Sequence, residues 1–231
     1  MIKHTQTTPH LLQVSNFDDL INTPFKPPIN AISWSRELAG DFEEIIHAID
    51  FEGNILELDE EDLMALNLSE AGKTARNTIL SDIELLTEYG AAPVLNIIKY
   101  YEADEHSFFS TDVYSFHVDR SPIATDTFLC TYFGATSEII PNEQAIQKIQ
   151  LPEIREKLLQ SYKGEIVNFE NYLSEQFFDL HYEALPNAAI TRAGIGDLWR
   201  LAVDHPKSEV LPCIHRAPKE KKGQKRLLLI C

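Results

Sequence analysis

The sequence predicts an α+β protein in which a β-rich barrel or sandwich carries an N-terminal layer of helices and a helical insertion. Apolar residues recur at helical spacing before residue 90, and short β-prone runs separated by turns follow Pro93. Helical spacing returns at about residues 143–180. We expect residues 1–90 to form an arm and helices that pack on the barrel, and residues 91–231 to form the barrel, as one compact unit.

Composition fits one large domain and excludes one class of partner. The chain has 231 residues, of which 44% are hydrophobic, enough to bury a sizeable core. Its net charge of −16 argues against a broad nucleic-acid surface, which needs a basic stripe. The acidity is an ordinary source of solubility, and we expect no nucleic-acid partner.

The cysteines and the N-terminus favour a cytoplasmic protein. Cys130, Cys213 and Cys231 are scattered and form no CxxC pair, so they indicate reduced thiols rather than a disulfide framework or a zinc knuckle. The first residues lack the pattern of a signal peptide. No apolar segment approaches the roughly 20 residues that span a bilayer, so we expect no membrane partner.

The N-terminal part is predicted to be an arm followed by three helices. Pro27 and Pro28 end any local helix in the arm. Asp59 and Ser69 are typical helix caps, and Gly90 is a typical residue just past a helix end. The expected elements are a strand or turn at Leu11–Val14, an extended piece at Ile29–Trp34, and helices at Glu37–Asp50, Asp59–Leu66 and Ser69–Tyr89.

The remainder is predicted to be a series of short strands. The run Thr127–Phe133 is the clearest, because it consists largely of aromatic and β-branched residues and ends at Gly134. The helical insertion follows the fourth strand. The expected strands are Val94–Tyr101, Tyr114–Arg120, Thr127–Phe133, Ser137–Ile140, Ala188–Ala193, Leu198–Val203, Val210–His215 and Arg226–Ile230.

A histidine and an aspartate two positions apart predict part of a metal site. His117 and Asp119 fall in an expected strand, where residues i and i+2 project to the same face. The third ligand should come from a distant strand, and we favour His215, which ends an apolar run. His205, in an expected turn, and His181, at the edge of the insertion, are weaker candidates.

Two histidines and one carboxylate on one side of a metal form the facial triad of non-haem Fe(II) oxygenases. This set leaves coordination positions open for a cosubstrate and oxygen. His117, Asp119 and His215 are therefore the metal ligands that the sequence predicts.

The order of the motifs resembles the double-stranded β-helix of the Fe(II)/2-oxoglutarate dioxygenases. In that superfamily HxD is followed by a distal histidine and then by a basic residue about ten positions on, and Arg226 stands eleven after His215. The resemblance implies a jelly-roll or cupin-like barrel that binds Fe(II) and takes 2-oxoglutarate as cosubstrate. It also implies that Arg226 pairs with the distal carboxylate of 2-oxoglutarate, a task that suits the planar guanidinium. Tyr132 is a candidate hydrogen-bond donor to the cosubstrate; the alternative is a strand aromatic packed in the core.

A narrower resemblance covers about residues 25 to 230. The chain resembles the bacterial domain-of-unknown-function family 1826, which implies no particular activity. The chain departs from the dioxygenase pattern in two places. The gap between Asp119 and His215 is long, and Leu228 stands where many dioxygenases have a serine or threonine. The motifs of the family resemblance are Asn30–Arg36, Phe116–Asp119, Cys130–Gly134, Gly196–Asp197, His215–Pro218 and Arg226–Leu229.

Other functions share these residues. The same ligands suit Zn²⁺, which would make the protein a zinc-dependent hydrolase or lyase on the same barrel. A non-enzymatic metal-binding or sensing protein is a third hypothesis. In the oxygenase the substrate would be a small molecule or a peptide.

A cluster of basic residues is unusual in so acidic a chain. If it lies at the mouth of the site, it would attract an acidic substrate; otherwise it is a solvated loop. The cluster consists of Lys219, Lys221, Lys222, Lys225 and Arg226.

Overall fold

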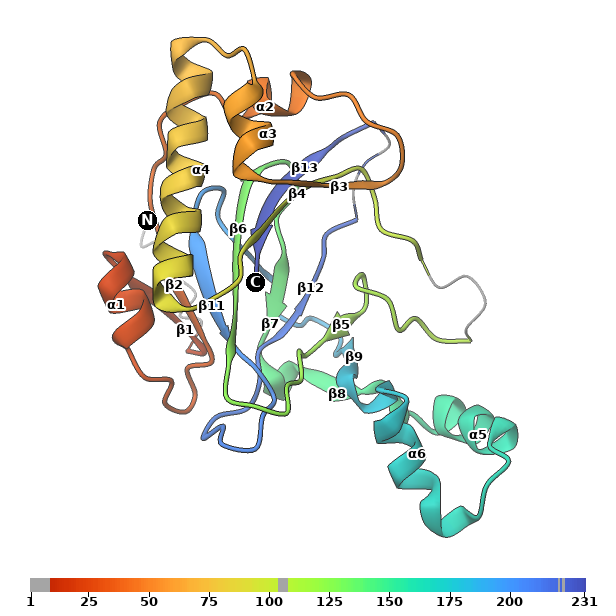
Figure 1. The fold of residues 1–231 in the computed structure, drawn as a ribbon. Coiled ribbons are helices and arrows are strands. Elements are labelled where there is room, and N and C mark those ends of the chain that lie inside the picture. The colour runs from red at the N-terminus through yellow and green to blue at the C-terminus, as the bar shows by residue number, and fades with distance from the viewer. Residues whose placement is uncertain (1–8, 104–107, 220, 222) are drawn as a thin grey trace, which may run out of the picture.

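The computed structural model describes residues 9–103, 108–219, 221 and 223–231. It is a mixed α+β fold in which two curled, mainly antiparallel sheets form a half-barrel, with several helices around it (Figure 1). Among the described residues, no helix has the length and apolar character needed to cross a membrane.

The first sheet has seven strands in the order β1-β2-β11-β6-β13-β4-β3. β1 and β2 pair in parallel, and the other pairs are antiparallel. The strands are β1 (Leu11–Val14), β2 (Ala31–Trp34), β3 (Ile55–Leu58), β4 (Val94–Ile98), β6 (Asp126–Phe133), β11 (Leu198–Ala202) and β13 (Arg226–Ile230).

The second sheet has six strands in the order β10-β7-β12-β5-β9-β8, all antiparallel. The strands are β5 (Phe116–His117), β7 (Glu138–Ile140), β8 (Ala145–Gln147), β9 (His181–Ala184), β10 (Thr191–Arg192) and β12 (Ile214–Arg216).

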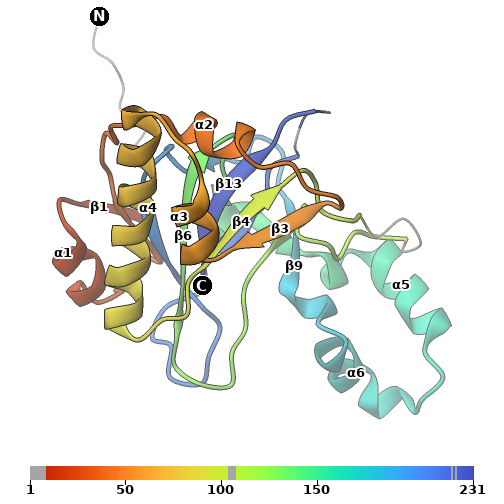
Figure 2. The same cartoon turned by 45° about the horizontal axis from the view of Figure 1, so that its top comes forward.

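The N-terminal helices cover the outer face of the first sheet (Figure 2). Asp59 and Ser69 cap their helices as predicted, and Gly90 ends the long helix in a left-handed conformation. One apolar cluster joins these helices to the sheet, so it combines residues from before and after residue 90. The helices are α1 (Phe17–Asn22), α2 (Phe42–His47), α3 (Glu60–Ala65) and α4 (Glu70–Tyr89).

The predicted insertion is largely helical and has a small core of its own. It stands to one side of the sheets in both views (Figures 1 and 2). Phe109 contributes to its core from outside the insertion, beside Leu158, Phe169 and Leu173. Its helices are α5 (Pro152–Ser161) and α6 (Phe169–Glu175), with short 3₁₀ turns at Asn142–Gln144, Lys148–Gln150, Ile166–Asn168 and Phe178–Leu180.

The space between the two sheets is the interior of the half-barrel. Its apolar cluster draws Leu129 and Leu228 from the first sheet and Ile139 and Cys213 from the second. Because side chains alternate along a strand, neighbouring residues of β6 face opposite ways. Leu129 faces the second sheet, whereas Tyr132 faces the helices.

One predicted helix was too long. Glu37–Asp50 was expected to be helical, but α2 begins only after Asp41, whose side chain caps it. Gly40 has a φ of 114°, and a Cβ there would come within 2.5 Å of the backbone of Ala75. The close contact with α4 therefore fixes a turn at Gly40, which a helix could not run through.

Several predicted strands were also too long. Tyr114–Arg120 retains only β5, because Arg120 leaves the second sheet and bridges to Asp204, two residues past the end of β11. Val210–His215 becomes β12, after Pro212, which has no N–H to donate to a ladder. Val94–Tyr101 and Ala188–Ala193 shorten to β4 and β10. Four further elements, α1, β3, β8 and β9, were not predicted, because they have only three to six residues each and show too little periodicity to recognise.

Candidate metal centre

The structure brings together the three predicted ligands. One nitrogen each from His117 and His215 and one oxygen from Asp119 all lie within 4.8 Å of one another. The Nε2 atom of His117 is 4.0 Å from Oδ1 of Asp119, and Nε2 of His215 is 3.7 Å from Oδ2. Among the described residues this is the one group of three or more such side chains that could share an ion.

Strand register explains why residues nearly a hundred positions apart converge. His215 on β12 lies directly opposite His117 on β5, and opposite residues of an antiparallel pair project to the same face. Phe116 and Val118 pack in a separate cluster on the outer face of the second sheet, so His117 faces the interior. The N–H of Asp204 donates to the carbonyl of Asp119 (2.8 Å), which fixes the backbone where the chain leaves β5.

Neighbouring groups orient all three ligands. Nδ1 of His117 is 2.8 Å from the carbonyl oxygen of Ser115, and Nδ1 of His215 is 3.2 Å from that of Cys213. A carbonyl only accepts, so each Nδ1 carries the proton and each Nε2 presents a lone pair toward the carboxylate. The hydroxyl of Thr127 donates to Oδ2 of Asp119 (2.5 Å).

The electrostatics favour the protonation states that bind a cation. Burial, with the nearby His215, lowers the pKa of His117 to about 4. Burial raises the pKa of Asp119, but His215, Thr127 and His117 outweigh that effect and hold the pKa below its usual value. At neutral pH the site thus combines a neutral His117 imidazole with an ionised Asp119 carboxylate, as metal binding requires.

The lowered pKa of His117 predicts a loss of stability in acid for the metal-free protein. Between its ordinary pKa of 6.5 and the folded value of about 4, the unfolded chain binds a proton that the folded chain does not. The free energy of unfolding should therefore fall as the pH drops through this range, by up to about 3 kcal/mol from this group. Urea unfolding in a chelator at pH 7 and pH 4.5 measures the fall. His117→Gln should show a smaller one, and equal falls in the two proteins would contradict the assignment.

The donor set fits a small divalent metal. Bonds of about 2.0–2.2 Å place neighbouring ligand atoms about 3–3.5 Å apart. The separations of 3.7 and 4.0 Å, which join the two imidazoles to different oxygens of Asp119, exceed this spacing by less than about 1 Å, and the three ligand atoms all lie within 4.8 Å of one another. His117, Asp119 and His215 would hold such an ion on one side and leave its other positions open.

The predicted cosubstrate residue Arg226 lies in the interior. Only 1% of it is exposed, and its Nη2 donates to Ser137 (2.8 Å) and Thr131 (3.3 Å). Ser137 lies two positions before Ile139, the residue opposite His215. At about 3.3 Å per strand residue, Ser137 stands roughly 7 Å along the sheet from the position of His215.

The structure does not bring Tyr132 to the triad. Its hydroxyl donates to Asp82 of α4 (2.6 Å), and its ring stacks on Phe42 with centroids 5.3 Å apart. Tyr132 projects from β6 away from the face that carries Thr127, so it packs in the core between sheet and helices. Tyr132 therefore has the position given by the alternative interpretation, that of a strand aromatic packed in the core.

The two weaker candidates for the third ligand, His205 and His181, lie in different parts of the structure. His205, the second choice for a ligand, lies on the loop after β11, where its Nδ1 accepts from the N–H of Lys207 (3.1 Å). His181 starts β9, directly opposite His117. Thr127 was not predicted as part of the site, although it lies in the predicted strand Thr127–Phe133; only the bond to Asp119 reveals its role.

The basic cluster is dispersed rather than gathered at one mouth. Lys225 binds the carbonyls of Ile46 and Ile49 in the helical layer, and Arg226 is buried. Lys219 and Lys221 line a pocket at the end of the second sheet, with Arg192 and Arg216, which both pair with Glu138. Lys222 lies outside the described residues.

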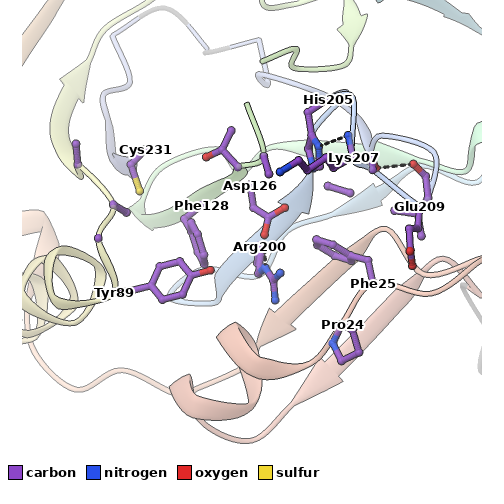
Figure 3. A pocket seen from close by; sticks show the side chains of 18 residues that line it. Pro24, Phe25, Tyr89, Asp126, Phe128, Arg200, His205, Lys207, Glu209 and Cys231 are labelled. Carbon is purple, nitrogen blue, oxygen red and sulfur yellow. Dashed lines mark hydrogen bonds and ion pairs between the residues drawn. The ribbon is translucent and has the colours of Figure 1, made fainter. Parts of the chain in front are cut away.

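One sizeable pocket lies away from the triad. It has a volume of about 810 Å³ and opens beside β6 and β11, between Phe25, Tyr89 and the loop that carries His205 (Figure 3). Two charged residues that line this pocket, Arg200 and Asp126, already pair with each other (2.6 Å), and Arg200 also donates to three backbone carbonyls. None of the triad residues lines it. This pocket is therefore separate from the candidate metal centre.

Removing the hydroxyl of Thr127 should weaken metal binding. Thr127→Val keeps the shape of the side chain but frees a ligand oxygen of Asp119. Outer-shell partners of metal ligands typically contribute 10- to 100-fold in affinity, so we expect a loss of about that size. Competitive titration with Co²⁺ and a chelating dye measures it. Thr125→Val, on the exposed residue two positions earlier, should leave the affinity unchanged; a similar loss in both variants would contradict the role of Thr127.

Comparison with family models, with curated proteins and with solved structures found no match to the chain.

Proposed function

We propose that the protein is a metal-dependent oxygenase that uses Fe(II) and 2-oxoglutarate to hydroxylate a small molecule or a peptide. The convergence of His117, Asp119 and His215, each oriented by a neighbouring group, carries the proposal. Two imidazoles and one carboxylate on one side of an ion are the ligand set of non-haem Fe(II) oxygenases.

The order of the strands supports a jelly-roll barrel. Eight strands run in sequence as β4, β5, β6, β7, β10, β11, β12 and β13. Numbered one to eight, they give the order 6-3-8-1 in the first sheet and 5-4-7-2 in the second. A jelly roll has this arrangement of eight strands in two facing sheets. In these terms His117 lies in strand two, Asp119 just after it and His215 in strand seven, and Arg226 begins strand eight.

The surroundings of Arg226 support a place for the cosubstrate. The buried guanidinium of Arg226 bonds Ser137, whose strand position is roughly 7 Å along the sheet from that of His215, a span that suits a five-carbon diacid held at the triad. Thr131 lies opposite Leu228, and its hydroxyl accepts a hydrogen bond from Arg226. It thereby supplies a hydroxyl beside the arginine, which the chain lacks at Leu228 itself.

Each residue then has a defined task. When bound, Fe(II) and 2-oxoglutarate would supply the oxidising chemistry. Asp119 offsets part of the charge of the cation, and His117 and His215 fix its position through their Nε2 atoms. Arg226 binds and orients the far carboxylate. The apolar residues between the sheets, among them Leu129 and Leu228, exclude water from the reacting groups.

Anaerobic addition of Fe(II) and 2-oxoglutarate tests the proposal. We expect a weak visible charge-transfer band, and release of succinate once oxygen is admitted. Arg226→Met should retain the metal but lose affinity for 2-oxoglutarate. A protein that binds metal yet gives neither band nor succinate would contradict the oxygenase.

The donor set itself favours one second candidate. Two histidines, a carboxylate and an open position equally suit Zn²⁺ with a bound water, as in hydrolases and lyases. Metal analysis of the protein as isolated, with hydrolysis assays in zinc, separates this function from the oxygenase.

Membership of domain-of-unknown-function family 1826 is part of our proposal, on the motifs quoted above.

A further inference from the structure

We propose that His181 is a positioning residue of the metal centre, whose imidazole hydrogen-bonds a small anion bound at an open coordination position. The inference rests on the proposed metal centre. It adds a residue from β9 that acts on the bound ligand rather than on the metal.

Strand pairing places three histidines in one row. β5 lies between β9 and β12, so His117 is directly opposite His181 on one side and His215 on the other. Because opposite residues of antiparallel strands project to the same face, all three rings face the interior. The ring centroid of His117 lies 4.6 Å from that of His215 and 5.9 Å from that of His181.

His181 is buried without a partner for one of its nitrogens. Its exposed fraction is 8%, and its Nδ1 makes no hydrogen bond to any described residue. The corresponding atoms of His117 and His215 both meet backbone carbonyls. A buried polar atom in a folded protein normally forms a hydrogen bond with protein, water or a bound molecule. The unpartnered Nδ1 of His181, beside the three metal-binding residues, therefore points to a group bound there.

Geometry assigns His181 to the ligand rather than to the ion. The clustered ligand atoms belong to His117, Asp119 and His215, and no nitrogen of His181 joins them. An ion held by these three residues would therefore not take His181 as a fourth protein ligand without movement of its ring. An imidazole in this row would instead meet an atom that the ion carries.

Azide binding to the Co²⁺-loaded full-length protein tests the inference. Azide occupies open positions on Co²⁺ whatever reaction the centre performs, and its terminal nitrogen accepts a hydrogen bond. We compare wild type with His181→Phe, which removes both ring nitrogens, and His181→Gln, which retains an N–H donor. His205→Gln is the matched control on a histidine outside the site. His181→Leu replaces the phenylalanine variant if that variant does not fold.

We expect all four proteins to bind Co²⁺ with the same visible bands and with affinities within about twofold of one another. The azide dissociation constant should rise about tenfold or more in His181→Phe, as for loss of a hydrogen bond to a charged group. It should recover most of that change in His181→Gln. A purely structural role would not give this rescue.

Three results overturn the proposal in distinguishable ways. An unchanged azide affinity in His181→Phe removes the hydrogen bond but leaves the metal centre intact. Altered Co²⁺ bands in His181→Phe before azide is added would make His181 a direct ligand instead. Binding of Co²⁺ that survives His117→Ala, or no binding by wild type, removes the metal centre and this inference together.

Discussion

His215→Ala should abolish tight metal binding while the protein stays folded. The substitution removes one of two imidazoles that face Asp119, and the remaining pair cannot hold an ion from three directions. Loss of an outer-shell partner already costs about 10- to 100-fold in affinity. Loss of a ligand should exceed that range, measured by calorimetric titration with Co²⁺ or by metal content after dialysis.

His205→Ala is the matched control for this prediction. His205 is the other histidine in the same stretch of chain, and its Nδ1 is engaged with the N–H of Lys207 on an exposed loop. Its removal should leave metal affinity within about twofold and the thermal melt little changed. If both variants lost metal equally, or if neither did, the triad would not be the metal centre.

The triad was predictable because its parts follow local rules. His117 and Asp119 are close in sequence, so alternation along an extended chain is enough to place them together. His215 needed only the assumption that its apolar run joins the same sheet. Both conditions hold even though β5 is shorter than expected and Asp119 lies beyond its end.

The groups that complete the site were not predictable in the same way. Thr127 and His181 contribute through strand pairing, and no spacing in the sequence encodes which strand lies beside which. For Tyr132 the strand was predicted correctly, but the side of the sheet to which the ring projects could not be predicted. That side depends on the helical layer, where the ring packs on Phe42 and its hydroxyl donates to Asp82.

The same limit applies to the fold. Helix caps at Asp59 and Ser69 and the stop at Gly90 are local signals, and α3 and α4 begin and end close to the predicted residues. The start of α2 depends on a contact between Gly40 and Ala75, 35 residues away, which no local pattern carries.

A buried ion pair in the helical layer was also not predicted from the sequence. The guanidinium of Arg36 binds both oxygens of Asp82 (2.7 and 2.5 Å), and Tyr132 donates to the same carboxylate. Arg36 also donates to the carbonyl of Gly196 and lies over the ring of Trp34. The group ties α4 to the chain after β2 and to β6. Asp82 itself lies among the apolar residues of the buried face of α4.

Asp82→Ala should destabilise the protein by about 3–5 kcal/mol, because it leaves the charge of Arg36 buried without its partner. Urea denaturation at pH 7 measures the change, and Glu84→Ala, on the exposed side of the same helix, should cost less than about 0.5 kcal/mol. The triple variant Arg36→Met, Asp82→Leu, Tyr132→Phe removes all three polar partners together. It should recover most of the loss, since an apolar replacement of a buried ion pair is often neutral or stabilising. If the triple variant were as unstable as Asp82→Ala, lost packing rather than an unpaired charge would explain the effect.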